Sequence, residues 1–273
     1  EKDWNAVSGK LGFDYELGAD SMIYGSISKG YKSGGMNLGG LEGYDPTQPS
    51  GVSATNTPFV EEESVWAYEA GWKNSMLDNQ LRLNLAAFYY DYEDMQAPIN
   101  YRDSNDITLT DFVNIPEATS LGFEVEALWL VSDSLQLIAN YSYLDTELSE
   151  SLILVDTALL VPEEVNVEGN ALPKAPENKV TIAASYYLDT DVGTFTFSAN
   201  WNHISEQYTG FFERELYNVG SFSTAGARII FDNLDESLRM ILSVSNITDE
   251  DAPINSLGFA GIFNNFARTE TPG

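Results

Sequence analysis

The chain has 273 residues, of which 13 are basic and 42 acidic, so its formal net charge is −29 at pH 7. This acidity argues against a nucleic-acid partner, because no basic surface exists to displace phosphate counterions, and the absence of cysteine excludes disulfides, thiolate zinc sites and a cysteine nucleophile. No apolar run approaches the roughly 18 to 20 residues of a membrane-spanning helix.

Apolar and polar side chains alternate along much of the chain, which indicates strands with one apolar and one polar face. In the clearest case we expect one set on the convex face of a curved sheet, Phe195, Phe197, Ala199 and Trp201, and the other on the concave face, Thr196, Ser198 and Asn200. The alternation predicts ten strands, at about residues 5–17, 22–32, 64–76, 81–94, 118–131, 135–147, 178–188, 194–208, 221–231 and 237–248.

The connections between these strands alternate strictly between short turns and long polar loops. The long loops are expected near 33–63, 95–117, 148–177, 209–220 and 249–267. All of them therefore leave the same end of the sheet. Several predicted strands are also longer than the 5–6 residues usual in soluble sheets. Both features favour an antiparallel up-and-down transmembrane β-barrel, in which apolar side chains face lipid and polar ones face the lumen.

Aromatic side chains gather near the predicted strand ends, which is typical of the girdles of membrane barrels, although aromatic residues favour strands in general. At the loop ends they are Phe88, Tyr89, Tyr90, Tyr92, Tyr141, Tyr143, Trp201 and Tyr208, and near the short turns they are Trp72 and Trp129.

Several segments, taken in order, resemble the C-terminal barrel half of TonB-dependent outer-membrane receptors. The clearest is SISKGYKSGGMN at 26–37, which resembles the strand-to-loop motif S-K-G-[FY]-[KR]-S-G-G-x-N of that family. Further segments that are similar to family motifs follow at 63–73 (ESVWAYEAGWK), 81–92 (LRLNLAAFYYDY), 118–126 (ATSLGFEVE), 170–179 (NALPKAPENK) and 245–250 (SNITDE).

The resemblance implies a receptor of the Gram-negative outer membrane that takes up a scarce solute in a TonB-coupled reaction, with a ferric siderophore as the expected cargo. The implied partners are outer-membrane lipid, a plug domain of the same protein and the TonB complex, which the receptor contacts through an N-terminal part. No enzymatic activity, cofactor or metal site is expected.

The family resemblance also implies parts that this sequence does not show, namely the plug, the TonB-contacting segment and a barrel of about 22 strands. We therefore expect residues 1–273 to be the C-terminal half of a receptor barrel, in the form of an open half-barrel. Its unpaired edges would be the strands near 5–17 and 237–248, and a last strand beginning at Arg268-Thr269 would be truncated.

Two groups of side chains are candidates for contacts with partners. Polar residues of the lumen face are expected to satisfy one another and to contact the plug: Glu69, Lys73, Arg82, Asn84, Glu124, Glu126, Asn140, Asn200 and Arg228. Loop aromatics and arginines are the candidates for ligand contact, because such residues are enriched at binding surfaces: Tyr31, Tyr44, Tyr101, Arg102, Phe211, Phe212 and Arg214.

Other chemistry-bearing residues have simpler interpretations. His203 is the only histidine and is expected to have a structural role, and Gly30, Gly34 and Gly35 are expected to let a strand bend into its loop rather than to bind phosphate. The acidic loop residues could attract cationic cargo or bridge divalent ions to lipid, but solubility in a saline habitat is the favoured explanation: Glu42, Asp45, Glu61, Glu62, Glu63, Glu150, Asp156, Glu163, Glu164, Glu168 and Glu177.

Two other function classes stay open at this point. A passive porin or surface adhesin would use the same barrel without a plug or a TonB-contacting segment. A soluble all-β carbohydrate-binding module would have shorter strands and would bury the apolar face under a second sheet.

Overall fold

The computed structural model describes residues 3–36, 59–102, 108–156, 159, 163–251, 253–259 and 265–270. These residues form strands and turns, and within them the only helical element is the short 3-10 segment η1 (Glu215–Tyr217). None of the described residues belongs to a helix that could cross a membrane.

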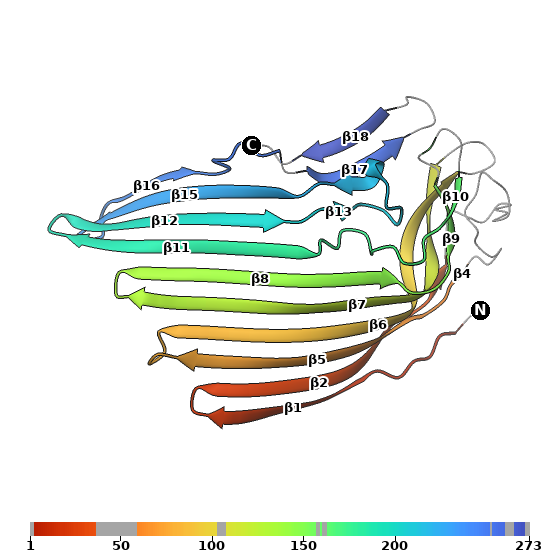
Figure 1. The fold of residues 1–273 in the computed structure, drawn as a ribbon, viewed down its shortest axis with the longest axis horizontal. Coiled ribbons are helices and arrows are strands. Elements are labelled where there is room, and N and C mark those ends of the chain that lie inside the picture. Colours follow the sequence, from red (N-terminus) through yellow and green to blue (C-terminus); the bar gives the residue numbers. More distant parts are fainter. Residues whose placement is uncertain are drawn as a thin grey trace.

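Ten strands form one antiparallel sheet in which every strand pairs with its neighbours in chain order (Figure 1). The strands are β1 (Gly9–Gly18), β2 (Ser21–Lys32), β5 (Glu63–Met76), β6 (Leu81–Arg102), β7 (Thr108–Ser132), β8 (Leu135–Leu148), β11 (Asn178–Thr190), β12 (Gly193–Ile204), β15 (Phe222–Asn233) and β16 (Arg239–Val244). The predicted meander is confirmed. In the described part of the chain β1 and β16 are the two edges and do not pair with each other, so the predicted open half-barrel is confirmed as well.

The remaining strands form four small pairs outside the large sheet, and Figure 1 places the labelled ones toward the end opposite the short turns. They are β3 (Gly35–Met36) with β4 (Phe59–Val60), β9 (Ile153–Asp156) with β10 (Glu163–Asn166), β13 (Gln207–Tyr208) with β14 (Asn218–Val219), and β17 (Pro253–Phe259) with β18 (Asn265–Glu270). Arg268 and Thr269 lie in β18, so the segment expected to begin the last barrel strand pairs here with β17.

The expected loop at 95–117 is wrong, because β6 and β7 continue as a long hairpin whose described pairing extends to Arg102 and Thr108. The hairpin leaves the sheet where Asp94 takes a left-handed conformation (φ 52°). Pairing of β6 with β5 ends at Glu93, so Pro98 lies on a free edge, where a missing N–H is tolerated. An alternating apolar set, which includes Ala97 and Ile99, is buried and holds the hairpin against neighbouring loops.

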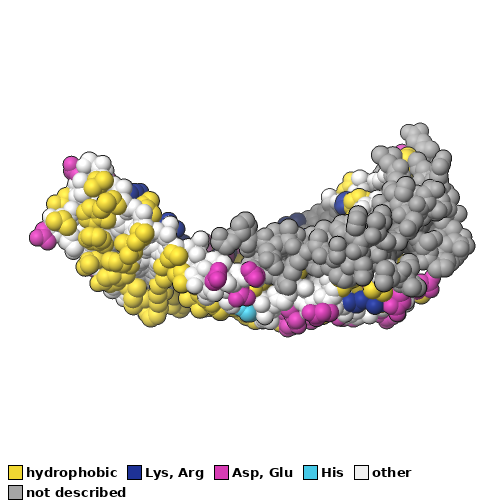
Figure 2. Space-filling view, turned by 90° about the horizontal axis from the view of Figure 1, so that it is seen from above, with side chains coloured by type: hydrophobic (Ala, Val, Ile, Leu, Met, Phe, Trp, Pro, Cys, Tyr) yellow, Lys and Arg dark blue, Asp and Glu magenta, His cyan; other side chains and the backbone are white. Residues whose placement is uncertain are grey.

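The pairing register gives the sheet one apolar and one polar face. Trp201 pairs with Ile182 and Ala225, whereas its neighbour Asn200 pairs with Ala183 and Gly226. Trp201 is 37% exposed and Phe197 38% exposed, so this apolar face does not line a sealed core. Figure 2 shows hydrophobic side chains over the short-turn half of the curved molecule, including its convex side, and more acidic ones toward the loop end. Among the described residues no second sheet packs on this apolar face, as the carbohydrate-binding alternative would require.

The predicted aromatic girdle is wrong in part. In the register, Phe88 pairs with Glu69, and Tyr90 and Tyr92 share its side of β6, which is the polar face of the sheet. Only Tyr89 among these residues lies on the apolar face, where it pairs with Tyr68. The reason is that four aromatic positions in five residues cannot all face one side of a strand.

Candidate functional site

The polar face of the sheet carries all of the predicted lumen residues. One row of paired residues runs across β5, β6, β7 and β8 through Lys73, Asn84, Glu126 and Asn140. Alternation along the strands puts the others on the same face: Glu69, Arg82, Glu124, Asn200 and Arg228. Their contact with a plug stays a prediction.

Some of these polar residues satisfy one another, as expected. The hydroxyl of Tyr24 donates to Glu69 Oε1 at 2.8 Å, and Asn84 Nδ2 donates to Glu126 Oε2 at 3.1 Å. Lys73 Nζ lies 5.5 Å from the centre of the Tyr24 ring. The polar face is thus a hydrogen-bonding surface with aromatic rings among its charges.

At the loop end, most of the buried apolar residues of the described chain form a core of their own. We call this cluster the loop core; its members come from β6, β7, β8, β9 and two loops and are Ala97, Ile99, Ile115, Ala118, Leu148, Leu154, Val167 and Phe211. Full burial of each large apolar side chain contributes about 1.5–3 kcal/mol. The core therefore gives the loops a fixed arrangement that does not depend on membrane lipid.

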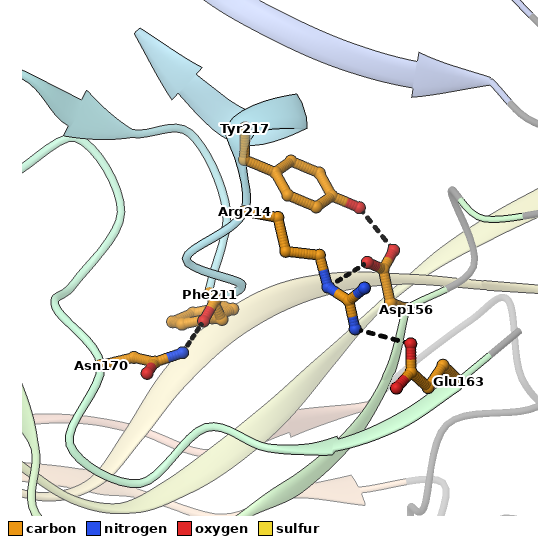
Figure 3. A network of polar contacts seen from close by, with 6 residues as sticks. All are labelled: Asp156, Glu163, Asn170, Phe211, Arg214 and Tyr217. Atoms are coloured by element: carbon orange, nitrogen blue, oxygen red, sulfur yellow. Dashed lines mark hydrogen bonds and ion pairs between the residues drawn. The ribbon is translucent and has the colours of Figure 1, made fainter. Parts of the chain in front are cut away.

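A network of polar contacts joins the loop between β8 and β11 to the loop between β12 and β15 (Figure 3). Arg214 Nε lies 3.3 Å from Asp156 Oδ2, and Arg214 Nη2 lies 2.9 Å from Glu163 Oε2. The hydroxyl of Tyr217 donates to Asp156 Oδ1 at 2.6 Å. We call these four residues the Arg214 network.

Other hydrogen bonds tie the same two loops together. Asn170 Nδ2 donates to the carbonyl oxygen of Phe211 at 2.8 Å, as Figure 3 shows, and the backbone N–H of Ala171 donates to Glu213 Oε1 at 2.8 Å. The two loops are consequently one packed unit rather than independent extensions of the strands.

The two carboxylates that contact Arg214 lie in different surroundings. The Asp156 side chain is 0% exposed, that of Arg214 is 33% exposed, and that of Glu163 is 58% exposed. Burial and the hydrogen bond to Asp156 raise the pKa of Tyr217 well above its usual value of 10, so its hydroxyl stays a donor at neutral pH. Loss of one partner of a buried ion pair costs about 3–5 kcal/mol, whereas an exposed pair contributes about 0–1 kcal/mol. The ion pair of Arg214 with Asp156 is therefore the strong contact of the network, and the ion pair with Glu163 is the weak one.

The structure distributes the predicted ligand-contact residues over several places. Phe211 is buried in the loop core, and the ring of Phe212 lies 5.7 Å from that of Tyr217. Tyr31 is exposed on the apolar face near the end of β2. Tyr101 and Arg102 end β6, but their side chains, like all of Tyr44, lie outside the described residues. Ligand contact by these residues stays a prediction.

The sequence did not indicate the partners of Arg214. The interpretation of Asp156 as a residue of an acidic, solvating loop is wrong, because its side chain is buried in an ion pair. The available signal was its position, since Asp156 and Thr157 interrupt an apolar stretch that begins at Leu152. A charge inside an apolar segment requires a partner.

The contacts of His203 and Gly34 are packing contacts within the fold, consistent with the structural roles expected for them. The His203 ring stacks on Trp201 with 5.8 Å between ring centres, and its Nδ1 lies 2.9 Å from Ser223 Oγ. Gly34 leaves no room for a Cβ, because Trp4 and the carbonyl of Val60 occupy that space. No group of three or more potential ligands for a metal ion occurs among the residues that the structure describes.

Comparison with known proteins gives one consistent result. A family model described as "TonB dependent receptor-like, beta-barrel" matches residues 1–247. The chain is 23% identical over 180 residues to the probable TonB-dependent siderophore receptor PiuA of Acinetobacter baumannii, covering 66% of this chain and 22% of PiuA. It is 24% identical over 243 residues to the pesticin receptor of Yersinia enterocolitica, covering 89% of this chain and 31% of that receptor.

The same result comes from solved structures. The ferric yersiniabactin uptake receptor FyuA from Yersinia pestis matches with a TM-score of 0.71 at 18% identity, covering 96% of this chain and 35% of FyuA. This likeness shows that the open sheet has the fold of part of a receptor barrel. The chain spans about a third or less of the length of these relatives.

Proposed function

The chain belongs to the TonB-dependent receptor β-barrel family, and on that premise we propose that it is part of an outer-membrane receptor for the TonB-coupled uptake of a ferric siderophore. The observation that carries this proposal is the combination of an apolar sheet face, a polar opposite face and a packed loop unit at one end. Passive diffusion requires only a wet lumen, whereas capture of a scarce solute requires a preformed binding surface above it. The family membership also favours a receptor over a passive porin or an adhesin.

In this proposal each surface has one task. The apolar face contacts outer-membrane lipid, and the polar face contacts a plug through residues such as Glu69, Glu124 and Arg228. The loop end captures the ferric siderophore through some of the predicted aromatic and arginine side chains. Coupling to TonB takes place through a part of the receptor other than these residues.

The charge of the chain restricts the cargo. With 42 acidic and 13 basic residues, the protein has a field that repels strongly anionic chelates. We therefore propose a ferric chelate of low overall charge.

The test is iron uptake by cells that express the gene of the full-length receptor in a Gram-negative host without its own siderophore receptors. We expect ⁵⁵Fe from iron-loaded siderophore mixtures to accumulate only in cells with an intact TonB. Uptake that persists without TonB would indicate a passive pore and would refute the proposal, and so would the absence of uptake in both strains. Immunodetection of the receptor in outer-membrane fractions is the control for its expression.

A further inference from the structure

Arg214 is held between two carboxylates that differ in how easily they can be replaced. Asp156 is buried, and it accepts a hydrogen bond from Tyr217 in addition to its contact with Arg214 Nε. Glu163 lies on the other edge of the guanidinium, at Nη2, and more than half of its side chain is in solvent. Asp156 therefore fixes the position of Arg214, whereas Glu163 can leave with little loss of stability.

The carboxylate of Glu163 shows which chemistry the outer edge of Arg214 accepts. A guanidinium presents its donors as a planar fork that matches a carboxylate. Because an exposed ion pair is weak, a carboxylate of a bound molecule can take the place of Glu163 at nearly equal free energy. On the Asp156 side, the Tyr217 ring packs against Phe212 with 5.7 Å between ring centres and its hydroxyl holds Asp156 in place.

We propose that Arg214 binds a free carboxylate of the ferric chelate and that Glu163 occupies this position until the chelate displaces it. The inference rests on the proposed function and deepens it, because it names a pendant carboxylate on the cargo. It also fits the acidity of the chain, since one dedicated cation selects a single carboxylate while the overall field disfavours chelates with many charges.

The chain offers a matched control for Glu163. Glu164 is the next residue of β10, where it pairs with Val155, and is also exposed; among the described residues its side chain makes no hydrogen bond or ion pair. Glu163→Gln and Glu164→Gln remove the same charge from neighbouring positions, so both change the overall field almost equally. Only Glu163→Gln removes a competitor for Arg214.

The experiment measures binding of two ⁵⁵Fe-labelled probes to the full-length receptor in detergent. Both probes are ferrioxamine B acylated on its free amine, one with an acetyl group and one with a succinyl group, so they differ by one free carboxylate. We expect the wild-type receptor to prefer the succinyl probe and Arg214→Gln to bind both probes equally. Glu163→Gln should bind the succinyl probe up to about fivefold more tightly, which corresponds to an exposed ion pair of up to about 1 kcal/mol.

Glu164→Gln should bind both probes nearly as the wild type does. Equal effects of the two glutamine variants, no preference for the succinyl probe, or binding of neither probe would each overturn the inference. TonB-dependent ⁵⁵Fe uptake from siderophore mixtures is measured in parallel, so a failure of the inference is distinguished from a failure of the proposed function. The Glu163→Gln comparison remains decisive even if Arg214→Gln disrupts the loops.

Discussion

Replacement of Asp156 by alanine should loosen the loops at the outer end of the barrel without affecting the strands of the large sheet. The change removes the acceptor of the Tyr217 hydroxyl and one of the two carboxylates at Arg214. A buried donor left without an acceptor costs about 1–3 kcal/mol. The loss at Arg214 is smaller than for a fully buried pair, because its side chain is 33% exposed and keeps Glu163. Together we expect about 2–4 kcal/mol for the closed loop arrangement.

Hydrogen–deuterium exchange of the full-length receptor measures this effect. The reporting amides are those of Thr209 and Tyr217, whose N–H groups donate to the carbonyl oxygens of Tyr217 and Arg214. A loss of about 2–4 kcal/mol corresponds to exchange faster by about 30-fold to 1000-fold where local opening controls it. Amides of β12 should keep their protection. Asp191→Ala in the short turn at the opposite end is the control; unchanged protection at Tyr217 in Asp156→Ala would show that the network does not hold the loops.

Three further outcomes follow from the described contacts. Because the pKa of Tyr217 is raised, the stability from its contact is complete below about pH 10, the pKa of the unfolded state, and is progressively lost above it; protection factors of the loop amides, corrected for intrinsic exchange, should fall there in the wild type and not in Tyr217→Phe. A Cβ at Gly122 would lie 2.5 Å from the ring of Phe88 on the polar face, so Gly122→Ala should lower the free energy of unfolding by about 1–3 kcal/mol in denaturant titrations. Gly220→Ala, with open space around the glycine, should not. Ile182→Arg on the apolar face should be destabilising in bilayer folding assays, by an amount that depends on depth and reaches at most about 2–4 kcal/mol, and Thr181→Arg on the polar face much less so; equal costs would contradict the assignment of the faces.

The strands were predictable because alternation is a direct consequence of strand geometry. Every strand of the large sheet was located, and the largest differences in the predicted bounds occurred where β6 and β7 leave the sheet. There the polar residues and Pro98 suggested a loop, although Ala97, Ile99 and Ile115 keep the period-two pattern. A short alternating segment indicates a strand only if a surface exists to bury its apolar side, and that surface comes from loops distant in the sequence.

The candidate site was less predictable for the same reason. Phe211, Phe212 and Arg214 were selected by residue type, but their partners Asp156 and Tyr217 are 58 and 3 positions from Arg214 and have no shared motif with it. An ion pair between two loops depends on how the loops pack, and no local propensity encodes it. Conversely, the face of the predicted lumen residues was predictable, because it follows from the parity of their strand positions alone; the same parity places Phe88, Tyr90 and Tyr92 on that face, against the predicted girdle.

In the proposed function, the loop core gives the barrel a packed surface in water above the membrane, on which a binding site can be held. The strands are held by their hydrogen-bonded ladder and by lipid on the apolar face, but neither reaches the loops. Long loops without a core would sample many conformations, and binding would then include the cost of ordering them. Burial of residues such as Leu148 and Val167 offsets this entropy loss during folding, so that the loops are already ordered before a ligand binds. The Arg214 network fixes the orientation of one cation on this packed unit. The buried Asp156 holds the guanidinium of Arg214, while the outer edge of the guanidinium stays accessible to solvent. If Arg214 binds the cargo as proposed, changes of exposed residues around that edge should alter cargo preference without disturbing either the loop core or the sheet below it.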